Sequence, residues 1–213
     1  MHSHVLLVAS RNRLPRIESS GGVAARCTRP DAVHLVSAAA TPLGGDTIDI
    51  RIIVEPGARL TLRSAAATVA LPGANTLASH ARWDIEAAGD LDVDPEPTVV
   101  AADARHICSI AVRLHGDGSV RVRERVQIGR CGEREGFWSG SLRADRHDRP
   151  LLRHRVELGA GSVADDVVCA PRASISELRY PATTSAGADE WLTVLPLAGG
   201  GTLSTWQGDR LSG

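Results

Sequence analysis

The chain has 213 residues, of which 43% are hydrophobic and 23% are charged, and its formal net charge is −1. This length fits one domain, residues 1–213, and is sufficient to bury a sizeable core. A nearly neutral chain with 3% aromatic residues lacks the basic surface and stacking side chains of a nucleic-acid-binding protein, and has no net attraction to an anionic membrane. All 24 basic residues are arginine, which we attribute to a GC-rich genome and not to function.

Cysteine usage and hydropathy indicate a cytoplasmic protein. No two cysteines have Cys-x-x-Cys spacing, and they occur at Cys27, Cys108, Cys131 and Cys169. No apolar segment approaches the roughly 18 residues of a membrane span, and Val5–Ala9 is too short for the apolar part of a signal peptide. We therefore expect reduced thiols that serve as small buried hydrophobic side chains.

Alternating apolar and polar residues predict short strands, most clearly within Thr41–Ala67. There, a glycine-bearing turn over Pro42–Asp46 leads into a strand, residues 48–52, with isoleucine at every second position. A reverse turn follows, because Pro56 presets φ and Gly57 tolerates a positive φ. The next alternating segment is expected to return beside the first one, so that the two form a hairpin.

Further alternation predicts strands at residues 33–37, 81–86, 91–94, 108–114, 120–123, 138–142 and 152–158. Turn centres near Pro56, Gly89, Asp117 and Asp148 are 33, 28 and 31 residues apart. An internal echo accompanies this spacing: residues 60–62 and 68–69 resemble residues 91–93 and 98–100. A two-strand unit of about 30 residues is typical of a stacked, solenoid-like architecture, and an ordinary sandwich gives a similar spacing.

The last part of the chain has a different pattern. Ser174–Leu178 can form a short helix, with Ser174 and Glu177 as a capping box, and residues 182–189 form a small-residue linker. No segment predicts a helix long enough to cover a parallel sheet. We therefore predict a mainly β fold of stacked antiparallel or mixed strands in a helicoidal, β-helix-like arrangement, with one or two short helices.

The sequence contains no G-x-S-x-G, phosphate-loop or H-E-x-x-H motif, so the candidates are single residues. Asp46 follows two glycines, where an Asx-turn or cap is the ordinary role. Glu124 is in phase with the apolar residues of its strand, and a buried carboxylate must be paired, hydrated or functional. Solvation between flanking arginines at a strand irregularity is the alternative. His154 also lies on an apolar face, where a hydrogen-bonded core histidine is the common case.

Several motifs, in order, resemble the urease accessory protein UreD family, also called UreH. They are the turn Gly44-Gly45-Asp46, the turn Pro56-Gly57-Ala58 with a small-residue run after it, Val126–Arg130, Gly132-Glu133 before Phe137, and Arg149–Leu158. The resemblance extends over residues 26–161, and residues 162–213 form a divergent C-terminal part.

The resemblance implies a helicoidal β fold and a non-enzymatic role in assembling the urease metallocentre. Family members form a complex with the accessory proteins UreF and UreG, dock on apo-urease and deliver nickel, which is bound transiently and not as a resident cofactor. Asp46 matches the family's Gly-Gly-Asp, Glu124 matches an acidic position, and His154 replaces a commonly acidic residue. We therefore expect Asp46, Glu124 and His154 to be weak, exchangeable nickel ligands on an internal path.

The sequence also departs from the family. Thr68–Leu71 and Val93–Pro97 replace segments that carry aromatic residues in members, and the C-terminus is short and lacks the helix with which many members end. Two alternatives remain: a β-helix carbohydrate-active enzyme, or a non-catalytic β-rich interaction module. The enzyme requires aromatic sugar platforms, which are scarce here, and a cupin-like metal site would require clustered histidines, which are also absent.

Overall fold

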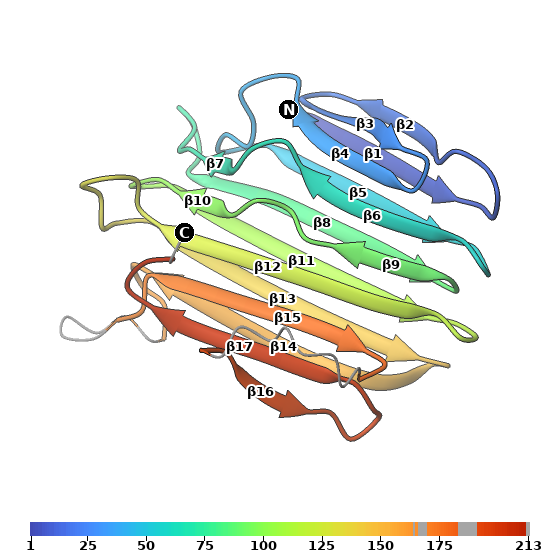
Figure 1. Cartoon of the computed structure of the whole chain (residues 1–213). Helices are drawn as coiled ribbons and strands as arrows, with labels where there is room; N and C mark the ends of the chain where they lie inside the picture. The colour runs from blue at the N-terminus through green and yellow to red at the C-terminus, as the bar shows by residue number, and fades with distance from the viewer. Residues whose placement is uncertain (164, 166–169, 183–190, 212–213) are drawn as a thin grey trace.

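The computed structural model describes residues 1–163, 165, 170–182 and 191–211. These residues form two β-sheets packed face to face around one hydrophobic core (Figure 1). The mainly β, stacked-strand prediction is confirmed. The predicted short helices are wrong for the described residues, because every element formed there is a strand.

The seven-stranded sheet has the spatial order β14 (Arg149–Gly159), β13 (Phe137–Arg146), β11 (Arg105–Leu114), β8 (Ala78–Ala87), β5 (Thr47–Val54), β1 (His2–Ala9), β2 (Arg16–Ser20). The ten-stranded sheet has the order β16 (Thr193–Pro196), β17 (Thr202–Gly208), β15 (Ala173–Tyr180), β12 (Ser119–Ile128), β9 (Asp90–Val93), β6 (Arg59–Ser64), β4 (Ala32–Ser37), β3 (Val23–Arg29). Its remaining strands are β10 (Thr98–Val100), which pairs with β12, and β7 (Thr68–Ala70), which pairs with β10.

The chain winds between the sheets, and successive coils stack in parallel. In the seven-stranded sheet, Ile52 lies level with Ile85, Ile85 with Val112, and Val112 with Ala144. These steps of 33, 27 and 32 residues confirm the predicted repeat of about 30 residues. The strands satisfy their backbone groups by pairing between coils, so the fold is a short β-solenoid.

The internal echo in the sequence has a direct counterpart in this stack. Leu60 of β6 lies opposite Leu91 of β9, and Thr68 of β7 lies opposite Thr98 of β10. Between these pairs the chain leaves the sheet at residues 65–67 and again at residues 94–97. Pro95 and Pro97 of the second segment cannot donate ladder hydrogen bonds. The ten-stranded sheet is therefore interrupted at the same level in two successive coils.

The predicted hairpin around Pro56 and Gly57 is wrong. The turn exists: the Ala58 N–H donates to the Glu55 carbonyl at 3.0 Å, and Gly57 has a φ of 70°. However, β5 and β6 belong to different sheets, so the turn carries the chain across the core. Each of the two strands has one apolar face. These faces are buried equally well whether the strands pair within one sheet or pack against each other from opposite sheets. Local alternation does not distinguish the two arrangements.

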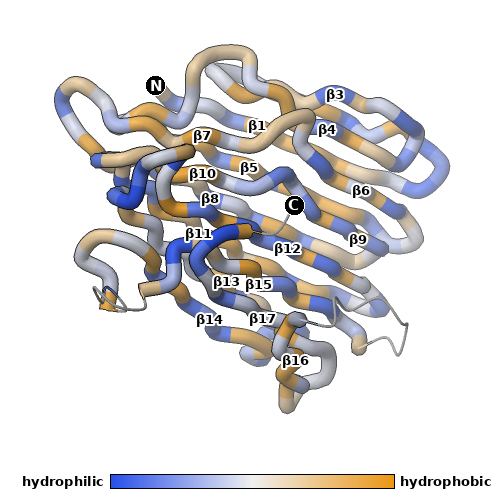
Figure 2. The backbone as a smooth tube through the Cα atoms, turned by 60° about the vertical axis from the view of Figure 1, so that its left-hand side comes forward, coloured by the Kyte–Doolittle hydropathy of each residue, from blue (hydrophilic) through white to orange (hydrophobic). Residues whose placement is uncertain are grey.

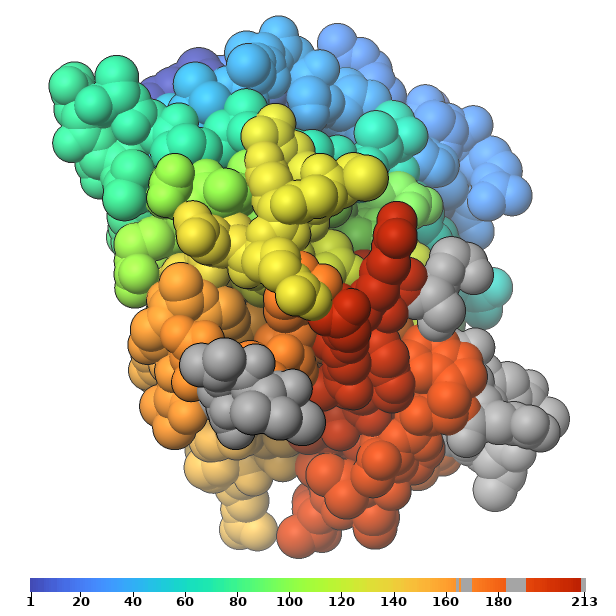
Figure 3. Space-filling view, turned by 90° about the vertical axis from the view of Figure 1, so that its left-hand side faces the viewer, coloured from blue at the N-terminus to red at the C-terminus, as the bar shows by residue number. Residues whose placement is uncertain are grey.

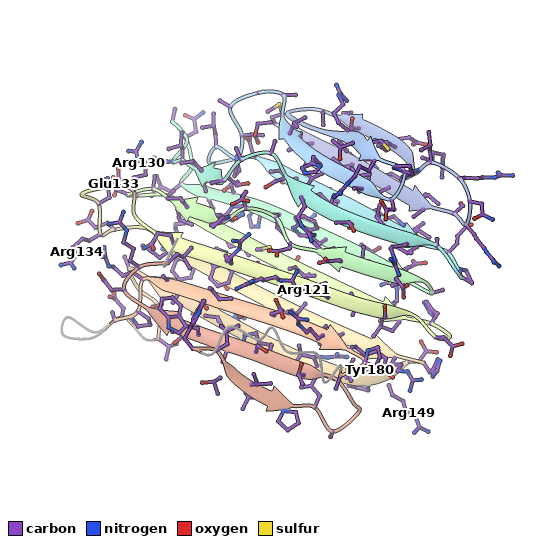
Figure 4. All side chains as sticks on the ribbon, viewed as in Figure 1. Arg121, Arg130, Glu133, Arg134, Arg149 and Tyr180 are labelled. Atoms are coloured by element: carbon purple, nitrogen blue, oxygen red, sulfur yellow. The ribbon has the colours of Figure 1, made fainter. Side chains whose placement is uncertain are left out.

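The segment predicted as a helix, Ser174–Leu178, lies in β15, which pairs antiparallel with both β12 and β17. On its outer face, Glu177 is 3% exposed and accepts a hydrogen bond from Arg121, which Figure 4 labels on β12. Cross-strand pairing thus supplies the partners that a helix cap would have supplied locally. The predicted capping box does not form.

The core is built from Val, Ile, Leu and Ala, with Trp138 as its largest buried side chain. Hydrophobic and hydrophilic positions alternate along the strands (Figure 2), as expected when one face of each sheet packs inward. Figure 3 shows the side of the stack where the loop after β12 projects from the surface. No helix long and apolar enough to cross a membrane occurs in the described part of the chain.

Candidate functional site

An internal cavity of about 360 Å³ lies between the sheets, beside the interruption of the ten-stranded sheet. Ile50 and Trp83 line it from one sheet and Val122 from the other, while residues 64–66 and 95 and 96 border it at the interruption. Its lining also includes ionisable residues. His106, Cys108 and Glu124 point inward from their strands, and Glu96, Arg123 and Arg125 also border the cavity. The cavity is therefore mostly apolar, with a few polar groups directed into it.

Glu124 and Cys108 form a hydrogen bond between the two sheets, since Cys108 lies on β11 and Glu124 on β12. Burial raises the pKa of Glu124 to about 7, and the hydrogen bond from the Cys108 thiol opposes that shift only in part. Burial, the Glu124 charge and the same hydrogen bond raise the pKa of the thiol well above its usual value. A protonated thiol donating to a carboxyl group that titrates near neutral pH is the chemical centre of the cavity.

Gly140 of β13 provides space for this pair. A Cβ atom at this position would lie 3.1 Å from Glu124 Oε2 and 2.1 Å from the ring of Trp138. Any larger residue would displace the tryptophan ring and crowd the carboxylate. The approach of Glu124 to the seven-stranded sheet therefore depends on a glycine in the neighbouring coil.

His106 is a second buried polar group of the cavity. It is 3% exposed, and its Nδ1 shares a hydrogen bond with Ser79 Oγ at 2.9 Å. Burial, with a smaller contribution from the charge of His80, lowers the pKa of His106 to about 4. The imidazole is therefore neutral at physiological pH.

His154 faces the same interior from β14, and the structure links it to Glu124 through Ser176. Its Nε2 shares a hydrogen bond with Ser176 Oγ at 3.1 Å, and Ser176 is the direct cross-strand partner of Glu124. Burial lowers the pKa of His154. Two of the three predicted site residues are thus brought to neighbouring positions in the core.

Asp46 lies apart from them, at the corner where β5 begins. It is 5% exposed and accepts hydrogen bonds from the Leu43 N–H and the Thr41 hydroxyl, both at 2.9 Å, and from the Met1 ammonium at 2.5 Å. Burial raises the pKa of Asp46, but the three hydrogen bonds together outweigh it and lower the pKa. The carboxylate closes the turn by accepting from residues that precede it, and not from the N–H two residues further on as in an Asx-turn. Thr41 connects this corner to the cavity wall.

The glycines of this corner meet two different demands. Gly45 has a φ of 94°. At Gly44 a Cβ atom would lie 1.8 Å from the Thr76 carbonyl oxygen, because residues 73–76 pack directly against the turn. Only glycine permits this contact.

The cysteine prediction is correct for Cys108 alone among the described cysteines. Cys27 and Cys131 are exposed free thiols, and Cys169 lies outside the described residues. Among the residues that the structure describes, no three His, Cys, Asp or Glu side chains are grouped closely enough to hold a metal ion together.

The sequence model of the UreD urease accessory protein family matches residues 10–190. The chain belongs to the UreD family. UreD 1 of Saccharopolyspora erythraea is 40% identical over 193 residues, which cover 86% of this chain and 74% of that protein. UreD of Parafrankia sp. (strain EAN1pec) is 36% identical over 220 residues, which cover 89% and 72% of the two chains. UreD of Frankia alni is 49% identical over 115 residues, covering 53% and 39%.

Two polar groups of this UreD-family cavity were not identified from the sequence. Cys108 alternates in phase with Ile110 and Val112, so it has the pattern of an ordinary core residue. His106 precedes it on the same face. The buried position of Glu124 was the available signal, because a carboxyl group in an apolar core requires a donor. The identity of that donor depends on the stacking of coils, which local patterns do not give.

Proposed function

We propose that this UreD-family protein supports urease maturation by passing nickel through the interior between its sheets, with Glu124 as the central contact. The contact of Glu124 with Cys108 inside the cavity is the observation that carries the proposal. It brings a carboxyl group and a thiol from opposite sheets to one point of a largely apolar interior.

The chemistry of Glu124 suits transit. A carboxyl group whose pKa is about 7 can release its proton when a divalent cation binds and recover it when the cation leaves. The charge of an apolar interior then stays low in both states, which limits the cost of desolvation. A thiol binds a metal only as its thiolate, and the Cys108 thiol stays protonated. Glu124 is therefore the one anionic ligand at this point, and the ion is held weakly enough to move on.

His154 and Asp46 extend the proposed path. Imidazole is a common ligand of first-row divalent metals, and His154 is adjacent to Glu124 through Ser176. Asp46 borders the cavity through Thr41. Since three donors already bind its carboxylate, a nickel contact at Asp46 would be additional to its role in the turn.

The chain acts in this proposal as a cytoplasmic scaffold and conduit, and not as an enzyme. Its partners are apo-urease and UreF-like and UreG-like accessory proteins, with nickel as cargo. Membership of the UreD urease accessory protein family supports these partners.

Urease activation in vitro tests the proposal. Apo-urease, the accessory proteins and nickel are combined with the wild-type chain, with Glu124→Gln, or with the exposed-site control Glu18→Gln, and urease activity and urease-bound nickel are measured. We expect Glu124→Gln to lower both several-fold while it still co-purifies with apo-urease, and the control to match wild type. Full activation by Glu124→Gln would refute the conduit, and failure of the wild-type chain to bind apo-urease or a UreF-like protein would refute the scaffold.

A further inference from the structure

A shallow trough of about 470 Å³ lies over β11, β13 and β14, on the face of the seven-stranded sheet that points away from the core. Its lining includes Ser109, Ser139, Ser141, Arg143, Arg153 and Arg155, and we call it the arginine trough. The serines are short, so they form a low floor, and the long arginine side chains rise around it.

The strand register concentrates positive charge in this trough. Arg143 lies directly opposite Arg153 on the neighbouring strand, and Arg155 lies one row further along, opposite Ser141. Like charges at directly opposite positions destabilise a sheet. An anion bound between these side chains would remove that repulsion.

Nearby carboxylates neutralise only part of the charge. Arg153 is paired with Asp145, and Arg155 donates to Glu157 at 2.6 Å. Arg143 is exposed and makes no hydrogen bond or ion pair with any residue that the structure describes. Three arginines thus face two acidic residues, and one guanidinium is left available for a ligand.

We propose that the arginine trough binds an acidic, extended segment of a partner protein. Charge complementarity identifies the occupant: several carboxylates in a row match guanidinium groups that are spread over two rows of the sheet, about 7 Å apart. The serine floor allows a peptide backbone to approach the sheet. Ser109 and Ser141 offer hydroxyl groups to it, whereas the buried Ser139 hydroxyl already donates to Glu157. This face is opposite to the cavity, so the inference does not depend on the proposed nickel path.

The openness of the trough argues against a small anion as its occupant. Its arginines are exposed, and an exposed ion pair contributes little by itself because water and salt screen it. A peptide with several carboxylates makes several such contacts at once. The formal net charge of −1 gives the protein no general attraction to acidic peptides, so binding requires a local cluster.

The experiment is a fluorescence anisotropy titration of the full chain into a labelled octapeptide of alternating Asp and Glu, with an octapeptide of alternating Asn and Gln as the neutral probe. We expect saturable binding of the acidic probe alone, weakened by added salt. Arg143→Ala should weaken binding about two- to fivefold, and Arg143→Glu should weaken it by about tenfold or more, because it also introduces repulsion.

Arg16→Ala is the matched control, because it removes one exposed arginine of the same sheet on the distant edge strand β2. It should leave binding unchanged, and thermal melting should show that all variants remain folded. An equal loss in Arg16→Ala and Arg143→Ala would show non-specific attraction and overturn the proposal. Absence of saturable binding would also overturn it, as would displacement of the probe by micromolar inorganic phosphate, which would indicate a small-anion site.

Discussion

Replacing Glu124 with glutamine should make the protein more stable at neutral pH. The substitution keeps the shape of the side chain and an acceptor for the Cys108 thiol, and it removes the ionisation that burial opposes. The ordinary pKa of 4.5 is raised to about 7 in the folded protein, so between these values the folded state holds more protons than the unfolded state. Stability from this group is therefore present at low pH and is lost as pH rises toward 7.

The size of the effect follows from the shift. The rise of the Glu124 pKa from 4.5 to about 7 corresponds to about 3 kcal/mol once Glu124 is ionised in both states. His106 acts in the opposite direction: its pKa falls to about 4, so its contribution grows as pH rises from 4 to 6.5. The pH dependence of wild-type stability includes the contributions of both Glu124 and His106. The difference between Glu124→Gln and wild type isolates the contribution of Glu124.

Urea unfolding of both proteins, followed by tryptophan fluorescence at half-unit steps from pH 4 to pH 8, measures this difference. We expect nearly equal free energies of unfolding at pH 4 and an advantage for Glu124→Gln that grows to about 3 kcal/mol by pH 8. A variant that is less stable than wild type at pH 8, or an advantage that does not change with pH, would refute the assignment of Glu124 as a buried, strained carboxyl group.

Three further predictions concern the corner before β5 and the thiols. Gly44→Ala should lower the free energy of unfolding by about 3 kcal/mol or more, because its Cβ would overlap the Thr76 carbonyl oxygen; a small change in chemical denaturation would contradict this. Asp46→Ala should lower the free energy of unfolding by about 2 kcal/mol through loss of buried hydrogen bonds, whereas unchanged stability with reduced urease activation would favour a nickel role. Peptide mapping after brief alkylation should find Cys27 modified and Cys108 protected until the protein unfolds, given their exposed and buried positions; early labelling of Cys108 would contradict the burial of this thiol.

Much of the fold was predictable because its signals are local. Isoleucine at every second position of residues 48–52 gives a strand with one buried face in any β architecture. The echo of residues 60–62 in residues 91–93 gives the coil spacing, because stacked coils place equivalent residues in register. The class of fold and the repeat follow from these two patterns.

Which strands pair, and which residues meet in the cavity, depends on contacts between residues far apart in the sequence. The Pro56-Gly57 turn is equally suited to a hairpin and to a crossing between sheets, and only strands about 30 residues away decide between them. Ser174–Leu178 has a local capping pattern, but β12 and β17 bind it as a strand. The parity of Glu124 indicated burial, while its contact with Cys108 depends on both Gly140 and the stacking of three coils.

The wall of the cavity beside residues 65–67 and 94–97 is formed by several coils together. Its mouth arises because two consecutive coils leave the sheet at one level. Glu124 lies on β12 in the next coil, and a slip of one residue between β12 and its neighbour β9 would turn the inward side chains of β12 outward and put Glu124 in solvent. The pair of Glu124 and Cys108 therefore forms only in molecules whose coils have docked in the correct register.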